Sequence, residues 1–281
     1  MQRLRSLCLL ALLLAPSAAF AQTESQEPSS VSGSVLRSES AELTNSREIR
    51  TRGFRQKLLQ ATKIEEQYVE RMTTFRKKRA EYRRTCREDL RRANRDAKFP
   101  MTLRCLRGEL ALEKEYREKE LERLIALPGI PNNVRSVSVS RLELLADAID
   151  TVMFAIDGDV YSGQDELLEG RKNLLQKYRL PYATALTQAR MEYLLTWTQY
   201  LIVSLDQTRT ELTFAPDAEQ AAAWETARRC LTGLESDLIS TQESEEAPTV
   251  SVLRSAMTTA KTCTDLLSAL PTEAASPTPA Q

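Results

Sequence analysis

The residues with the clearest chemistry are four cysteines, which could close disulfide bonds in an exported protein. They are Cys86, Cys105, Cys230 and Cys263. The first two lie at equal distances from a break just before residues 98–100, and the other two lie at equal distances from a break within 244–248. Residues equidistant from a turn face each other in an antiparallel helix pair. We therefore expect the pairs Cys86–Cys105 and Cys230–Cys263, and no four-cysteine zinc site, because such sites usually use close C-x-x-C pairs.

A dense basic run is the strongest indication of binding. Residues 47–107 contain 20 Lys and Arg against 8 Asp and Glu, whereas residues 128–281 contain 12 against 21. The candidate binding residues are Arg76, Lys77, Lys78, Arg79, Arg83, Arg84, Arg87, Arg91 and Arg92. Three interpretations stay open: a solvated helix surface, docking on the acidic half of the same chain, or attraction to an anionic envelope polymer, a membrane surface or an acidic protein.

One acidic segment resembles a calcium-binding loop in its spacing. Asp157, Asp159 and Asp165 fall at positions 1, 3 and 9 of such a loop. Position 6 is Ser162 in place of Gly and position 12 is Leu168, so the two-oxygen ligand that Glu supplies is missing. We interpret the segment as a helix–loop–helix turn and expect no metal and no cofactor.

The composition removes most kinds of catalysis. The chain has no histidine, which excludes Ser-His-Asp and Cys-His catalysis and histidine-bound metal sites. It has only 8 Gly and lacks the G-x-S-x-G pattern. A carboxylate pair of the glycosidase kind stays open, although aromatic residues make up only 6% of the chain. We expect a protein that is not an enzyme, with a carboxylate-based helical enzyme or a calcium-modulated binding protein as alternatives.

Residues 1–21 have the pattern of a cleaved signal peptide. Arg3 and Arg5 precede an apolar run at residues 7–14, and Ala19 and Ala21 occupy the positions expected of a cleavage site. The apolar run is too short to span a bilayer comfortably. The sequence therefore predicts an extracytoplasmic protein, periplasmic or secreted, and for such a protein we expect no nucleic-acid partner.

The elements that position these residues are predicted to be helices throughout, which gives an all-α fold. A long basic antiparallel hairpin of coiled-coil type should precede a C-terminal helical bundle that contains the second disulfide-linked hairpin. Its first arm should end at Lys98, before Phe99-Pro100, and Pro181 should open a separate long helix. The predicted divisions are 22–45 (disordered linker), 46–127 (hairpin), 128–133 (linker), 134–270 (bundle) and 271–281 (disordered tail).

These features predict an exported, non-enzymatic helical protein that binds or scaffolds in the envelope or outside the cell. Its basic hairpin would contact an anionic or acidic partner. A second expectation concerns Phe54, Leu58 and Leu59, which precede the part of the hairpin that the second arm can cover. These side chains should pack on the bundle of the same chain, on another copy or on a partner.

Overall fold

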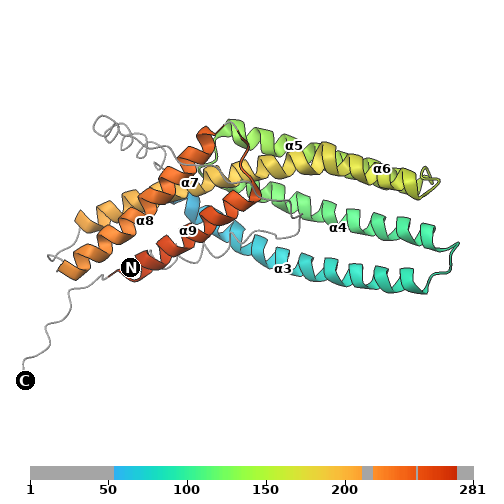
Figure 1. Ribbon diagram of the computed structural model, residues 1–281, viewed down its shortest axis with the longest axis horizontal. Coiled ribbons are helices and arrows are strands. Elements are labelled where there is room, and N and C mark those ends of the chain that lie inside the picture. The colour runs from blue at the N-terminus through green and yellow to red at the C-terminus, as the bar shows by residue number, and fades with distance from the viewer. Residues whose placement is uncertain (1–53, 211–217, 245, 271–281) are drawn as a thin grey trace, which may run out of the picture. The chain divides into compact units, whose positions relative to one another are not determined.

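The computed structural model describes residues 54–210, 218–244 and 246–270, with side chains from Glu70 onward (Figure 1). Throughout these residues the chain is helical and forms no strand, which confirms the all-α class. The helices are α3 (Phe54–Arg92), α4 (Lys98–Ala126), α5 (Asn132–Asp157), α6 (Gln164–Leu174), the π-helical turn η1 (Leu175–Arg179), α7 (Leu180–Thr210), α8 (Ala218–Glu243) and α9 (Val250–Ser268).

Several predicted segments lie outside this description. They are the signal peptide 1–21, the linker 22–45, the start of the first arm at 46–53, the tail 271–281 and the side chains of Phe54, Leu58 and Leu59. No helix in the described part of the chain is long and apolar enough to cross a membrane.

The chain divides into two compact units, and the division falls inside α7. The first, here called the N-terminal unit, comprises residues 56–193 with 246–249. The second, the C-terminal unit, contains the rest of α7 from Leu194, together with α8 and α9. The loop at 128–133 therefore lies inside the N-terminal unit, where it connects α4 to α5.

Helices α3 and α4 are antiparallel neighbours joined by the turn at residues 93–97 (Figure 1). The Asn94 side-chain oxygen accepts a hydrogen bond from the Ala97 backbone N–H at 2.9 Å and closes this turn. The first arm ends at Arg92, six residues earlier than expected, and Pro100 lies in the first turn of α4. Proline is tolerated there because the N–H that it lacks would have no partner inside the helix.

A narrow stripe of α3 packs on α4. Met72 is buried and Phe75, Tyr82 and Cys86 are partly buried, at the three- and four-residue spacing that the sequence indicated. The Phe75 ring stacks on Tyr116 with centroids 5.0 Å apart, and the Tyr82 hydroxyl donates to the Arg104 carbonyl at 3.1 Å. The disulfide Cys86–Cys105 links the two helices near their turn and confirms the first expected pair.

The opposite face of α4 supplies the core of the N-terminal unit, together with α5 and α7. Leu110, Leu124, Leu145 and Ile149 are almost completely buried in it. The hydroxyl of Ser138, a small residue of α5, donates to the Ala185 carbonyl of α7 at 3.1 Å, so these helices approach closely.

The turn between α4 and α5 is fixed by one arginine and one glycine. The guanidinium of Arg135 donates to the carbonyls of Leu124 and Ile125, which lie in the last turn of α4 and would otherwise lack partners, and to those of Leu127 and Ile130 in the loop. Gly129 has a φ of 77°, a left-handed conformation in which a side chain would be strained.

The chain is helical without interruption from residue 164 to residue 210, through α6, η1 and α7. The sequence had predicted instead that a new helix begins at Pro181. The Leu180 N–H donates to the Leu175 carbonyl in the five-residue spacing of a π turn. Proline in an α-helix loses one hydrogen bond and its ring crowds the carbonyl four residues earlier. The π turn directly before Pro181 changes the hydrogen-bond pattern at that place, so the chain passes the proline without a break.

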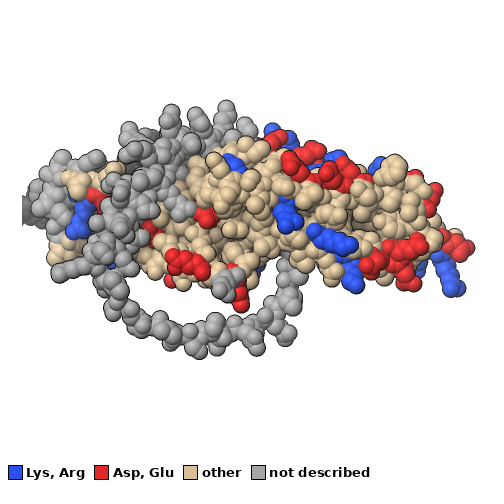
Figure 2. All heavy atoms as spheres, turned by 90° about the horizontal axis from the view of Figure 1, so that it is seen from above, with Lys and Arg blue, Asp and Glu red and all other residues tan. Residues whose placement is uncertain are grey.

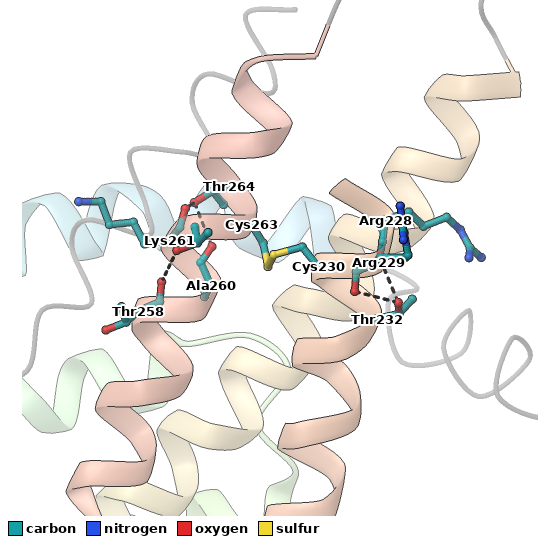
Figure 3. Close-up of a disulfide and its surroundings, with 10 residues drawn as sticks. Arg228, Arg229, Cys230, Thr232, Thr258, Ala260, Lys261, Cys263 and Thr264 are labelled. Atoms are coloured by element: carbon teal, nitrogen blue, oxygen red, sulfur yellow. Dashed lines mark hydrogen bonds between the residues drawn. A yellow bond between two sulfur atoms is a disulfide. The ribbon is translucent and has the colours of Figure 1, made fainter. Parts of the chain in front are cut away.

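Helices α8 and α9 form the second disulfide-linked pair. Cys230 and Cys263 are bonded with their Cα atoms 5.5 Å apart, which confirms the second expected pair (Figure 3). Cys263 is completely buried, and Trp224, Leu231 and Leu267 are buried in the same unit. Beside the bond, the Thr264 hydroxyl donates to backbone carbonyls of its own helix, and Thr232 does the same in α8.

We predict opposite outcomes for two glycine-to-alanine substitutions in helix interiors. Gly233→Ala should raise the free energy of unfolding by up to about 1 kcal/mol, because alanine favours the helix and no atom obstructs its Cβ. Gly108→Ala should give no gain or a loss, because its Cβ would clash with the Tyr82 ring and displace its hydrogen bond to Arg104. Urea unfolding followed by circular dichroism measures both; equal gains would contradict the packing of Tyr82 on Gly108.

We also predict that glutathione reduces Cys86–Cys105 before Cys230–Cys263. Both cysteines of the first pair are partly exposed, so glutathione can attack either sulfur. In the second pair only Cys230 is partly exposed, and attack there must expel the thiolate of Cys263, which is 0% exposed and whose burial disfavours the charged form. Timed alkylation followed by mass spectrometry gives the order, and simultaneous loss of both bonds would contradict it.

Candidate binding surface

Helix α3 carries an outward-facing row of cations, here called the cation stripe, formed by Lys77, Arg84 and Arg91. These residues follow one another at seven-residue intervals, so they share one face of the helix. All three are exposed, whereas Phe75, Tyr82 and Cys86 on the α4-facing side are partly buried. The exposed residues Glu81 and Glu88 lie between the three cations on the same face, at i+4 from Lys77 and from Arg84. The helical rise spreads the stripe over about 21 Å.

Other basic residues of the same run are neutralised by α4. The carboxylate of Glu109 pairs with the guanidinium groups of both Arg79, at 2.9 Å, and Arg83. These two arginines lower the pKa of Glu109, although burial alone would raise it. Lys78 lies 4.0 Å from Glu115, and Arg87 donates to the Arg83 carbonyl.

The structure therefore separates the nine predicted binding residues into two groups. Arg79, Arg83 and, more weakly, Lys78 pair with carboxylates of α4. The three stripe residues, together with Arg76, Arg87 and Arg92, are exposed and have no carboxylate within 4.0 Å among the described residues. The sequence could not make this distinction, because Glu109 lies 26 to 30 residues away from its partners.

A second cluster of charges is buried between α4 and α7 inside the N-terminal unit. Glu113 and Glu120 are only 2% and 1% exposed. Glu113 pairs with Arg179 at 2.6 Å and with Arg117 at 3.3 Å. Glu120 pairs with Arg117 at 2.8 Å and with Arg190 at 3.4 Å.

Aromatic rings complete the surroundings of this cluster. The Arg117 guanidinium carbon lies 5.1 Å from the Tyr116 ring centroid and 4.8 Å from that of Tyr182, within the range of cation–π attraction. Burial raises the pKa of Tyr182 well above its usual value, and the negative charge of Glu120 adds to the effect. The phenol therefore stays protonated.

The cluster holds the Glu120 carboxylate in the charged form. Burial alone would raise the pKa of Glu120, but Arg117 and Arg190 lower it below its ordinary value. Burial alone would lower the pKa of Arg117, yet Glu120 and Glu113 raise it. These ion pairs link α7 to α4, although the Nε atoms of Arg117 and Arg190 are buried without a hydrogen-bond partner. A carboxylate held between two guanidinium groups serves poorly as an acid or base. The sequence did not reveal the cluster, although Glu113, Arg117 and Glu120 share one helix face at i, i+4 and i+7.

The first acidic residue of the candidate calcium loop is engaged by an arginine. Asp157 accepts two hydrogen bonds from the Arg107 guanidinium, at 2.5 and 2.9 Å, which lower the pKa of its carboxyl. The neighbouring Glu166 accepts from the Ser162 backbone N–H and hydroxyl. Asp159 and Asp165 are exposed, and within the described ranges no group of three or more His, Cys, Asp or Glu could hold a metal ion.

Comparison with known proteins adds no assignment to this surface. No protein-family model matches the chain, and neither a curated protein nor a solved structure matches it.

We predict that Glu120→Gln lowers the free energy of unfolding at neutral pH by about 3–5 kcal/mol, because it leaves two arginines buried beside a neutral group. The pKa of Glu120 is lower in the folded protein than in the unfolded chain, where it is about 4.3. Its contribution is therefore fully present above that pH and is lost as the pH falls below it. The difference between wild type and variant should shrink on acidification in denaturant melts.

Glu122→Gln is the matched control, two residues away on the same helix. Glu122 is exposed and pairs with Lys119 and Arg71. Removing its charge should therefore lower the free energy of unfolding by only about 0–1 kcal/mol. A similar decrease in the free energy of unfolding for the two variants would contradict the conclusion that the buried ion pairs of Glu120 stabilise the fold.

Proposed function

We propose that this protein is an exported, non-enzymatic binding or scaffolding protein that presents the cation stripe of α3 to an anionic partner. The observation that carries the proposal is the separation of the basic run into paired and unpaired groups. Lys77, Arg84 and Arg91 stand on the face away from α4, and none of them is within ion-pair distance of a described carboxylate, although Glu81 and Glu88 lie between them on that face.

The spacing of the stripe indicates the shape of the partner. Cations about 10 Å apart along one straight helix match an extended anionic surface better than a single small anion. The candidates are an acidic protein, an anionic envelope polymer or a membrane surface. Attraction of this kind speeds encounter and is weakened by salt, because at physiological ionic strength it reaches only about 8 Å.

The proposed location rests on the two disulfides and on residues 1–21. Both disulfides join cysteines at bonding distance, which is compatible with an oxidising, extracytoplasmic compartment. We propose that residues 1–21 direct export and are then cleaved. In that compartment an envelope polymer or another exported protein is a more accessible partner than nucleic acid.

The test compares wild type with the triple variant Lys77→Gln, Arg84→Gln, Arg91→Gln. Poly-L-glutamate and vesicles of phosphatidylglycerol and phosphatidylcholine serve as anionic probes. Wild type should bind at least one of the two probes at low salt. Its affinity for that probe should fall steeply as the salt concentration rises to the physiological range. If each cation contributes about 0.5 kcal/mol, the triple variant should bind roughly tenfold more weakly. Glutamine also favours helix, so helical content should not change.

A second triple variant, Arg141→Gln, Arg171→Gln, Lys177→Gln, removes the same charge from exposed positions of α5, α6 and η1. Its binding should stay near that of wild type. Equal weakening of both variants would show that only net charge matters, and absence of binding to every probe at low salt would overturn the proposal.

A further inference from the structure

The hairpin of α3 and α4 also has a groove on its surface, within the N-terminal unit. Its described lining residues belong to these two helices, and its volume is about 420 Å³. Volumes of roughly 300–1,000 Å³ are typical of sites that bind small organic groups. The groove is therefore large enough for a ring the size of a sugar.

The inner wall of the groove is apolar and aromatic. It contains Met72, which is 7% exposed, and the stacked rings of Phe75 and Tyr116. The Tyr116 hydroxyl donates to Glu120 of the buried cluster at 3.1 Å, so it is already engaged. The two rings and the thioether therefore offer a surface on which the apolar face of a ligand ring can pack.

Charged side chains of both signs border this wall. The cations are Arg71, Lys78 and Lys119. Lys78 lies 4.0 Å from Glu115 and Arg71 lies 3.4 Å from Glu122, and all four side chains are more than half exposed. Exposed pairs of this kind contribute little, so their charged groups can turn to a ligand. A border of donors and acceptors fits a ring that carries hydroxyl groups, because a hydroxyl both donates and accepts.

The groove continues the line of the cation stripe. Glu70 at the edge of the groove precedes Lys77 by seven residues, the interval that also separates Lys77 from Arg84. Lys78, which borders the groove, is the neighbour of Lys77 in the chain. A polymer that places one ring in the groove can therefore extend along the stripe.

The carboxylates within the stripe restrict which polymer can follow it. Glu81 and Glu88 lie between the cations on the same face of α3. They repel a chain that is charged at every unit, whereas hydroxyl groups donate hydrogen bonds to carboxylates. This face therefore fits an anionic chain in which hydroxyl groups lie between the charges.

We infer that the anionic partner is a polysaccharide that packs one sugar ring in the groove and follows the cation stripe with its carboxylates. This inference rests on the proposed function, because it names the chemical class of the partner of the same site. The C–H face of the sugar would pack on Phe75, and its hydroxyl groups would bond to Lys78 and Glu115. Carboxylates of the following units would approach Lys77 and Arg84.

The test uses three polymers that separate charge from ring structure, with full-length protein and both disulfides formed. Hyaluronan has a carboxylate on every second sugar, dextran has sugar rings without charge, and poly-L-glutamate has charge without sugar rings. At equal carboxylate concentration and low salt, wild type should bind hyaluronan about threefold to tenfold more tightly than poly-L-glutamate. This preference should persist at physiological salt, because ring packing is not screened. Dextran should bind more weakly than hyaluronan, because it lacks the charge.

The methyl group of Met72 reports on the groove without any substitution there. Its carbon-13 resonance should shift when hyaluronan is added and should stay in place with poly-L-glutamate. This measurement decides the question even where a change at Phe75 loosens the hairpin.

Two substitutions test the ring of Phe75. Phe75→Leu should weaken binding of hyaluronan about threefold to tenfold and leave binding of poly-L-glutamate unchanged, because the stripe is intact. Phe75→Tyr keeps an aromatic ring and should bind hyaluronan as wild type does. Circular dichroism establishes that both variants are folded.

The matched control is Phe154→Leu, which removes a ring from another surface of the same unit. Phe154 belongs to α5 and is 78% exposed. Helices α5 and α6 lie uppermost in Figure 1, so Figure 2 shows their side of the N-terminal unit, where acidic and basic residues are interspersed. This variant should bind hyaluronan as wild type does.

The outcomes separate the inference from the proposed function. Equal affinity of wild type for hyaluronan and poly-L-glutamate, an unshifted Met72 resonance, or equal weakening by Phe75→Leu and Phe154→Leu overturns the inference. If the stripe variant then still loses affinity for poly-L-glutamate or the phosphatidylglycerol vesicles, the proposed function stands with another partner. If wild type binds no anionic probe at low salt, both are rejected.

Discussion

Two carboxylates on the buried face of α4 set the strongest constraint on the N-terminal unit. Glu113 and Glu120 can be buried only where guanidinium groups compensate their charge, and two of these groups, on Arg179 and Arg190, come from a segment about 70 residues further along the chain. The register of that segment is therefore fixed, and Arg179 is the last residue of the π turn that precedes Pro181. With α7 fixed on one side of α4, α3 is left to pack on the other side, where its outward face stays open to solvent.

The sequence was sufficient for what depends on local periodicity and symmetry. The all-α class follows from the spacing of apolar residues, and both disulfides follow from their equal distances to two turns. The break expected at Pro128 and Pro131 agrees with the end of α4 at Ala126 and the start of α5 at Asn132. Two other prolines were read incorrectly. Pro100 belongs to the first turn of α4, and Pro181 lies in a continuous helical segment after a π turn. A proline shows that a hydrogen bond is absent, but the tertiary packing decides whether the helix also ends there.

Contacts between distant segments could not be predicted in this way. The basic run of α3 looks uniform in sequence, and only the position of Glu109 on α4 shows which arginines are paired. Similarly, Glu113, Arg117 and Glu120 resemble the ion pairs of any exposed helix until α7 is packed on them. Composition reports how many charges a segment has, whereas function depends on which of them the fold leaves without a partner.

The attachment of α3 also has a mechanical consequence. From Met72 to Cys86 this helix is held on α4 by a narrow row of side chains, which a force on the N-terminal side would peel away one contact at a time. Peeling must stop at Cys86, because the disulfide to Cys105 passes the load directly into α4. The turn between these cysteines is then bypassed and carries almost no tension. Arg91 lies inside that closed segment, whereas Lys77 and Arg84 lie on the part that can be pulled off, so a stretched molecule would keep only the end of its cation stripe in place.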